Sequence, residues 1–476
     1  MKLTQARAQT IIDQVALGLP ASYNHHYYSS GLERLLATFE REYFASYLPA
    51  GGAVFKLLVG AFGSGKTHTC YALRDAAWRH HFAVAYVPLE QRSSFAELSS
   101  VYRDIASNLT LPPHGYVRPA QDPIGVPELL PDEPLPEERG ISSVVRSWYA
   151  KHHAEVCREV LEPAEQDTSS TEITEINGTE INNTEIKARL RGRLADMREQ
   201  LNTDNANLTR ALLASFEALI EGREHTFDDL SQWLAGAGFN RVIHKKQHGI
   251  LEPVSDRNAL SLLCGLSEWL QFMGYQGLVV LFDQDTPDVN HSDSHEASNH
   301  HSKHQNETAT NTPDGHDKAH IAHLANLLTL VNETANQRMQ ALMLLYAVPD
   351  TKFLQGGAQV YEALNQRLSS VFDSDLNPSG VRLLLEQVLP NNSEYLSDIG
   401  YKLAYLHEVA YHQPFEDEDA LENLITRVAE RSLQRRYLVP GYRRLFVQAL
   451  SSALTVLRQE GRTLSHHELE RLMVQS

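Results

Sequence analysis

The apolar residues of this chain gather in four short runs that are separated by long stretches of mixed polar and apolar residues. Short apolar runs that end in turn residues are typical of strands buried on both faces of a parallel sheet. The chain therefore predicts buried strands at residues 54–59, 82–87, 277–283 and 341–348.

The stretches between these runs have the periodicity and composition of helices. We expect helices at residues 67–79, 94–109, 187–222, 227–236, 257–273 and 320–337. Strands that alternate with helices predict an α/β fold with a mainly parallel sheet flanked by helices. Helical patterns also dominate the end of the chain, which predicts an all-helical lid domain there.

Three domains follow from these patterns. Residues 1–52 form an N-terminal helical segment, residues 53–376 form the α/β core, and residues 377–476 form the helical lid. Two stretches interrupt the core as inserts, one at about 111–250 and one at 286–319.

Each insert contains a segment of biased composition. Residues 165–186 hold the triplet Thr-Glu-Ile four times, and we expect a mobile surface segment there. Residues 286–319 are rich in Asn, Ser, Asp and His. The histidines allow a metal site, but they lack a fixed ligand spacing and apolar anchors, so we favour a disordered loop.

Composition narrows the possible partners and the compartment. The formal net charge of −18 argues against a freestanding, non-specific DNA binder, although a local basic groove stays possible. Residues 421–476 are locally basic, with nine arginines against five glutamates, and Arg435 and Arg436 could contact DNA or a partner protein or form a solvated face. The chain has no run of about 18 apolar residues, no signal-peptide pattern and three widely spaced cysteines, so we expect a cytoplasmic protein without a membrane span.

The strongest chemical signal is a Gly-x-x-x-x-Gly-Lys-Thr phosphate-binding loop at residues 60–67. It lies between a predicted strand and a predicted helix, which is the context that the motif requires. Lys66 should neutralise the phosphates of ATP, and the hydroxyl of Thr67 should hold Mg²⁺. The residues predicted to bind the nucleotide here are Gly60, Gly63, Ser64, Gly65, Lys66, Thr67 and His68.

Asp283 completes the predicted nucleotide site. It closes an apolar strand, and an aspartate at that position reaches the Mg²⁺ ion in many ATPases. We expect its strand to lie directly beside the strand that precedes the phosphate loop.

The residue after Asp283 raises a question about catalysis. Many ATPases have a glutamate there that polarises the attacking water, but this chain has Gln284, which cannot accept a proton at neutral pH. Three interpretations stay open: slow hydrolysis and a role as an ATP-responsive switch, substitution by Asp285, or a carboxylate donated by another chain. The sequence therefore leaves open whether the protein is an ATPase.

Several other polar positions fit a nucleotide site. Asp350 and Thr351 follow the last predicted strand, where a polar side chain can sense the γ-phosphate. Arg367 could reach the nucleotide of a neighbouring subunit or pair with a surface carboxylate. Arg443, at the start of a lid helix, could sense the γ-phosphate from above. The aromatic stretch at 23–28 could pack on the nucleotide base or serve as a packing arm.

The chain resembles the ATP-binding domain family of the BREX phage-defence systems, in particular its smaller BrxD-type members. The resemblance rests on residues 11–20, 55–67, 274–283, 349–350 and 361–368, which occur in the family's order and cover about half of the chain. It implies an AAA+-like P-loop ATPase that forms oligomers and works with other defence proteins on phage DNA. Most members of the family have an acidic residue where this chain has Gln284.

Two hypotheses therefore stand, with a third behind them. The first is an ATP-binding and ATP-hydrolysing component of a bacterial anti-phage system that couples nucleotide state to assembly on double-stranded DNA or on partner proteins. The second is a nucleotide-bound switch or scaffold with little hydrolysis, because Gln284 replaces the catalytic acid. The third is a P-loop regulator of transcription or signalling unrelated to defence.

Overall fold

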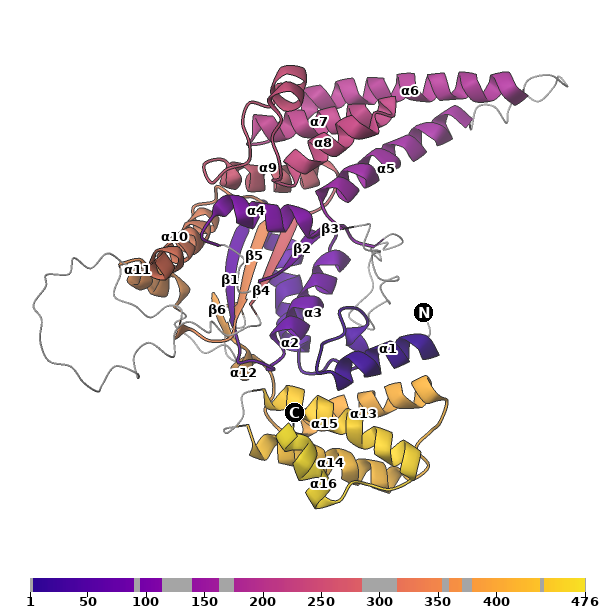
Figure 1. Cartoon of the computed structure of the whole chain (residues 1–476), viewed down its shortest axis with the longest axis vertical. Helices are drawn as coiled ribbons and strands as arrows, with labels where there is room; N and C mark the ends of the chain where they lie inside the picture. The colour runs from indigo at the N-terminus through magenta and orange to yellow at the C-terminus, as the bar shows by residue number, and fades with distance from the viewer. Residues whose placement is uncertain are drawn as a thin grey trace, which may run out of the picture.

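The protein is built around one six-stranded sheet, seen at the centre of Figure 1. The computed structural model describes residues 3–89, 95–113, 139–161, 175–284, 315–352, 359–369, 379–436 and 441–475. Across the sheet the strands follow the order β3-β2-β4-β5-β1-β6, and all neighbours are parallel except β2 and β3. The strands are β1 (Ala53–Val59), β2 (Ala83–Pro88), β3 (Leu109–Thr110), β4 (Leu278–Asp283), β5 (Leu342–Val348) and β6 (Arg382–Leu384).

The four strands predicted from apolar runs, β1, β2, β4 and β5, are confirmed. The sheet is mixed and not wholly parallel, because the chain turns back at β3 and pairs antiparallel with β2. Strands β3 and β6 were not predicted. They are only two and three residues long and carry no apolar run of their own.

One expected neighbour relation is wrong: β4 does not lie beside β1, because β5 separates them. Every residue of β5 is buried, whereas β1 carries the charged Lys56. However, β4 is also buried at every residue, and β1 too has a partner strand on both edges, so burial alone does not decide which strand is central. The apolar runs of β1, β4 and β5 look alike in the sequence, so the sequence does not show which of these strands lies between the other two.

Helices cover both faces of the sheet. On one face, α2 (Glu33–Phe39), the π-helix η2 (Glu40–Tyr47) and α3 (Lys66–Arg79) share an apolar cluster with alternate strand residues. On the other face, α4 (Leu98–Ser107), α9 (Ala259–Phe272), α10 (Gly315–Ala335) and α11 (Gln359–Leu368) pack in a second cluster. Side chains that alternate between the faces of a strand explain why two separate cores form.

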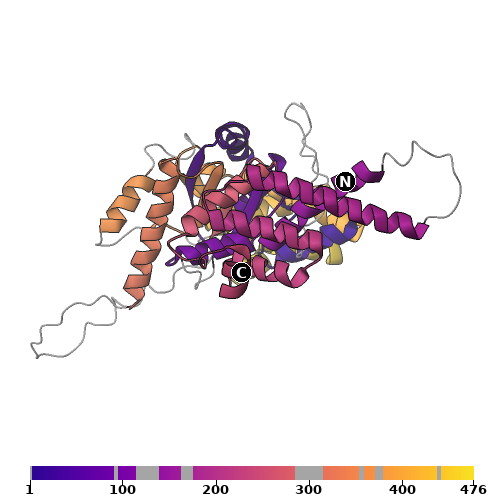
Figure 2. The ribbon, with the colours of Figure 1, turned by 90° about the horizontal axis from the view of Figure 1, so that it is seen from above.

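The first insert is helical and extends the second core. It contains α5 (Ile141–Leu161), α6 (Glu175–Gln200), α7 (Ala206–Glu221), α8 (Glu224–Leu234) and the short π-helix η5 (Arg241–Gln247). Helices α5 and α6 project from the body as a long arm in both views (Figures 1 and 2).

Part of the segment expected to be mobile is instead helical. Residues 175–186 belong to α6, while residues 165–174 lie outside the described part of the chain. Ile186, Leu190 and Leu194 are buried and stand four residues apart, so they form one apolar stripe along the helix. The repeated triplets therefore lead into a helix whose apolar stripe packs in the second core. Most of the second insert also lies outside the described residues.

The C-terminal helices form a separate bundle below the sheet in Figure 1. The bundle contains α13 (Ser393–Tyr411), α14 (Glu418–Gln434), α15 (Tyr442–Glu460) and α16 (His466–Gln475). Helix α1 (Gln5–Ala16) packs on α13 and α15 and shares their apolar cluster through Ile11, Ile12 and Val15. The segment expected at 1–52 therefore divides, because α1 joins the bundle and α2 joins the sheet. The short helices η1 (His25–Tyr27) and α12 (Leu385–Val388) lie between them.

The described helices include none that is both long enough and apolar enough to cross a membrane.

Candidate functional site

A cleft opens where the loop between β1 and α3 faces the helical bundle. It encloses about 860 Å³, open solvent included. One wall is formed by the phosphate loop and the first turn of α3, a second by the segment after α1, and a third by α13 and α15. The lining residues are Val15, Gly18, Leu19, Pro20, Tyr28, Ser30, Leu32, Gly63, Ser64, Gly65, Lys66, Thr67, His68, Thr69, Leu389, Tyr395, Ile399, Arg443, Arg444 and Val447.

The phosphate loop has the backbone shape that its glycines allow. Gly63 and Gly65 have φ angles of +72° and +104°, which other residues adopt only with strain. A side chain at Gly60 would come within 2.5 Å of Ser64 Oγ. Helix α3 begins at Lys66, directly after Gly65, so its free N–H groups and partial positive charge face the cleft. The side chain of Lys66 is buried against the loop.

Thr67 and Asp283 meet at the end of this loop although 216 positions separate them in the chain. The Thr67 hydroxyl donates to Asp283 Oδ2 at 2.6 Å. Tyr86 on β2 donates to the same oxygen at 2.9 Å. Burial raises the pKa of the Tyr86 phenol, so it remains a donor. A hydroxyl and a carboxylate held together are oxygen ligands of the kind that Mg²⁺ prefers, so this donor set fits that ion.

Gln284 follows Asp283 at the end of β4, and Tyr346 holds its amide while His323 contacts Tyr346. The Tyr346 hydroxyl donates to Gln284 Oε1 at 3.1 Å, and His323 Nε2 lies 3.1 Å from the same hydroxyl. Because the carbonyl oxygen of the amide accepts the tyrosine proton, the NH₂ group is the part of Gln284 that is directed elsewhere. The position presents a hydrogen-bond donor where a glutamate would present a base.

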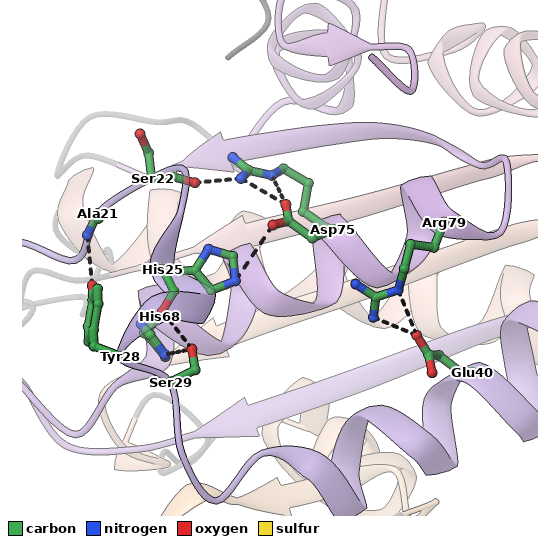
Figure 3. A network of polar contacts seen from close by, with 10 residues as sticks. Ala21, Ser22, His25, Tyr28, Ser29, Glu40, His68, Asp75 and Arg79 are labelled. Carbon is green, nitrogen blue, oxygen red and sulfur yellow. Dashed lines mark hydrogen bonds and ion pairs between the residues drawn. The ribbon is translucent and has the colours of Figure 1, made fainter. Parts of the chain in front are cut away.

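His68 connects α3 to the segment that precedes α2 (Figure 3). Ser29 Oγ donates to the carbonyl of His25, so it accepts from His68 Nε2, 2.7 Å away. Burial lowers the pKa of His68 to about 3, and the ring is neutral. Asp75 on α3 lies 3.6 Å from His25, and the same segment donates from Ala21 N–H to Tyr28 Oη. These contacts hold the aromatic stretch 23–28 against α3, and Tyr28 reaches the cleft.

The first turn of α15 packs directly on the phosphate loop. The backbone N–H of Arg444 donates to the Gly63 carbonyl at 3.3 Å, and the Arg444 guanidinium lies 4.9 Å from the centre of the Phe62 ring. The guanidinium of Arg443 is buried and is bound by Glu386 at 2.9 Å and by Asn391 at 2.6 Å. Both arginines line the cleft, but only Arg444 lies on the phosphate loop itself.

The remaining predicted residues lie apart from this cluster. Asp350 is exposed after β5, where it accepts from the backbone N–H of Lys352, and Thr351 is half-buried beside it. Arg367 is exposed on α11 and does not line the cleft. Asp285 lies outside the described residues.

Four contributing residues were not predicted: Tyr86, His323, Tyr346 and Arg444. Tyr86, His323 and Tyr346 come from β2, α10 and β5, far from the phosphate loop in the sequence, and no motif marks them. Arg444 is next to the predicted Arg443 at the start of a helix, and the basic pair Arg443-Arg444 was the available signal. The sequence does not say which of the two arginines reaches the loop. In the structure Glu386 binds Arg443, and Arg444 lies on the loop.

Comparison with protein families gives a match that spans most of the chain. The model of a family described as "BREX system ATP-binding protein BrxC/D" matches residues 3–115, 136–293 and 316–471. The matched segments include the phosphate loop, Asp283 and most of the helical bundle. No curated protein and no solved structure matches the chain.

Proposed function

Since the chain belongs to the BREX system ATP-binding protein family BrxC/D, we propose that it is an ATP-dependent component of an anti-phage defence system that couples its nucleotide state to assembly on DNA or on partner proteins. The observation that carries this proposal is the 2.6 Å contact between Thr67 and Asp283 at the mouth of the phosphate loop. A structural turn would not need a buried carboxylate brought from another strand to that position.

In this proposal each residue of the cleft has a separate task. The loop N–H groups and Lys66 bind the phosphates, and the apolar wall around Tyr28 and Ile399 receives the base. Thr67 and Asp283 would hold Mg²⁺, which would supply positive charge to the phosphate oxygens. Arg444, seated on the loop, senses whether the cleft is filled.

The architecture supports an AAA+-like ATPase. A mostly parallel sheet carries the phosphate loop, and a separate helical bundle closes over it from the C-terminal side. Arg367 is exposed on α11, where it could reach the nucleotide of an adjoining subunit in a homo-oligomer. Such an arginine would complete the site only after assembly.

A second function is favoured by the environment of Gln284. Its amide oxygen is held by Tyr346, and its side chain cannot take a proton from water. A protein with this arrangement would bind ATP tightly, hydrolyse it slowly and act as a nucleotide-bound switch or scaffold.

The test is a pair of measurements on the purified protein. Mg·ATP affinity is measured by calorimetry, and phosphate release is followed over hours with and without double-stranded DNA. We expect Lys66→Ala to abolish ATP binding and phage defence together, while Lys151→Ala, an exposed lysine on α5, leaves both unchanged. Normal ATP affinity in Lys66→Ala would refute the site. DNA-stimulated turnover favours the first function, and tight binding without turnover favours the second.

A further inference from the structure

A basic, acid-free segment follows α8 in a protein whose formal net charge is −18. No acidic residue occurs between Asp229 and Glu252, whereas Arg241, Lys245 and Lys246 all fall in η5 and are exposed. We propose that this surface, η5 with its three cations, binds the phosphate backbone of double-stranded DNA. The inference deepens the proposed function by naming the surface through which the protein contacts DNA.

The segment is held rigidly in place. His244 of η5 is buried and contacts the Asp229 carbonyl through Nε2 at 3.0 Å, while its Nδ1 accepts from the Asn240 N–H. The ring of Phe239 stacks on His244. Asn240 caps the start of η5 by accepting from Val242 N–H and Ile243 N–H. A surface fixed in this way loses little conformational freedom when it binds.

The exit from η5 is fixed as well. Arg210 of α7 donates to the Gly249 carbonyl, and the Leu251 N–H donates to Asn207. The segment is therefore anchored to α7 and α8 at both ends, and the cations between the anchors face solvent.

Several other basic residues of the insert are paired with carboxylates. Arg146, Arg191 and Arg198 pair with Glu224, Glu221 and Glu217, and Arg193 pairs with two glutamates of α5. Within the described ranges, Arg241, Lys245 and Lys246 make no side-chain hydrogen bond or ion pair. Arg241 and Lys245 stand four residues apart, where like charges repel. An anionic partner would remove this repulsion.

The basic C-terminal helices offer no comparable surface. Arg435 pairs with Glu470, Arg462 pairs with Glu460 and Glu468, and Arg436 donates to the Asn391 carbonyl. These arginines therefore stabilise the bundle. The three cations of η5 lie instead beside α7 and α8, at the opposite end of the molecule from that bundle (Figure 1).

The exposed residues of η5 suit a duplex better than other anionic partners. Binding to single strands relies on aromatic side chains that stack on bases, and η5 exposes none. Membrane surfaces require an apolar face next to the charges, and Val242 is the only exposed large apolar residue within η5. Backbone phosphates need only spaced cations, which is what the surface provides.

The experiment compares two triple variants of the full chain without nucleotide. Arg241→Ala/Lys245→Ala/Lys246→Ala removes the proposed surface. Lys151→Ala/Arg158→Ala/Lys187→Ala removes the same charge from exposed positions of the α5–α6 arm. Fluorescence anisotropy with a labelled duplex is recorded over a salt series, and ATP affinity is measured separately for each variant.

We expect the first variant to bind duplex at least about tenfold more weakly, with a salt slope smaller by about 3, because roughly one unit is lost for each phosphate contact. The control should bind like the wild type, and both should retain normal ATP affinity. Equal weakening in both variants, an unchanged first variant or no duplex binding by the wild type would overturn the proposal. The proposal would also be overturned if the η5 surface bound single-stranded DNA or anionic vesicles more tightly than duplex DNA. Lys66→Ala should still bind duplex in this experiment, because no nucleotide is present. Failure of the proposed nucleotide site can therefore be distinguished from failure of the proposed DNA surface.

Discussion

At the scale of single residues, the question of catalysis depends on one side chain and its two neighbours. Gln284 occupies the position after the strand aspartate, and its amide oxygen accepts from Tyr346, whose hydroxyl is in turn contacted by His323. An amide held in this way can donate to a phosphate or orient a water, but it cannot act as a general base. The structure around Gln284 is therefore compatible with nucleotide sensing and unfavourable for rapid hydrolysis.

Replacing Gln284 by Glu tests this reading directly. If the missing base limits turnover, Gln284→Glu should raise ATP hydrolysis by about 10²-fold, within the range expected for a general base. Tyr346 can donate to the new carboxylate, so the double variant Gln284→Glu/Tyr346→Phe separates the base from its positioning. Phosphate release under saturating ATP is the measurement. Gln284→Ala is the control, and no rise above that control in Gln284→Glu would mean that another step limits turnover.

At the scale of elements, the contact between the aromatic segment and α3 ties the N-terminal part of the chain to the phosphate loop. His68 directly follows Thr67 and hydrogen bonds to Ser29, whose carbonyl in turn accepts from Lys402 of α13 at 2.8 Å. One serine therefore links the first turn of α3 to the helical bundle. If nucleotide binding displaced α3, this link would transmit the movement to α13.

The desolvation of the half-buried His68 makes this link sensitive to acid. Its folded pKa is about 3 and its reference value is 6.5, so below pH 6.5 the unfolded chain takes up a proton that the folded chain refuses. Its contribution to stability therefore falls as pH decreases from 6.5 toward 3, by about 1.4 kcal/mol per pH unit. His68→Gln should lose about 2 kcal/mol less than the wild type between pH 7 and pH 5.

Urea unfolding at the two pH values measures this difference. The amide of glutamine can still donate to Ser29, so the variant should fold. His467→Gln, at an exposed position on α16, controls for the loss of one histidine. Equal acid sensitivity in His68→Gln and the wild type would contradict a neutral, desolvated His68.

At the scale of the whole molecule, the cleft is formed by parts of the chain that lie at its two ends. Helix α1 belongs to the C-terminal bundle, and the residues that follow it, Gly18, Leu19 and Pro20, form one wall of the cleft. The phosphate loop forms the facing wall. A ligand that fills the cleft would therefore contact the sheet and the bundle at once, and in the proposed function this would couple nucleotide binding to their relative position.

Weakening the contact between α1 and the bundle should thus weaken ATP binding without touching the phosphate loop. Ile12→Ala removes a buried side chain of α1 and should cost about 2–5 kcal/mol of stability as well as reduce ATP affinity several-fold. Leu424→Ala removes a buried side chain of α14, which packs on α1 less extensively than α13 and α15 do, and should cost similar stability with normal ATP affinity. Calorimetry and thermal unfolding report the two quantities. A similar ATP affinity in both variants would contradict the coupling.

Much of the fold and the core of the candidate site follow from the sequence alone. Apolar runs predicted β1, β2, β4 and β5 correctly, and the motif at residues 60–67 predicted the loop between β1 and α3. These features are local: a strand buried on both faces needs consecutive apolar residues, and a phosphate loop needs glycines at fixed spacing. Each is therefore visible in a short window of sequence.

The tertiary structure decided which elements lie side by side. It placed β5 between β1 and β4, joined α1 to the C-terminal bundle, and brought Tyr86, Tyr346 and Arg444 to the site. Such neighbours depend on which packing of many similar apolar surfaces has the lowest free energy, and no local pattern records that choice. For this reason the sequence identified Thr67 and Asp283 as partners, but only the fold determined what surrounds them.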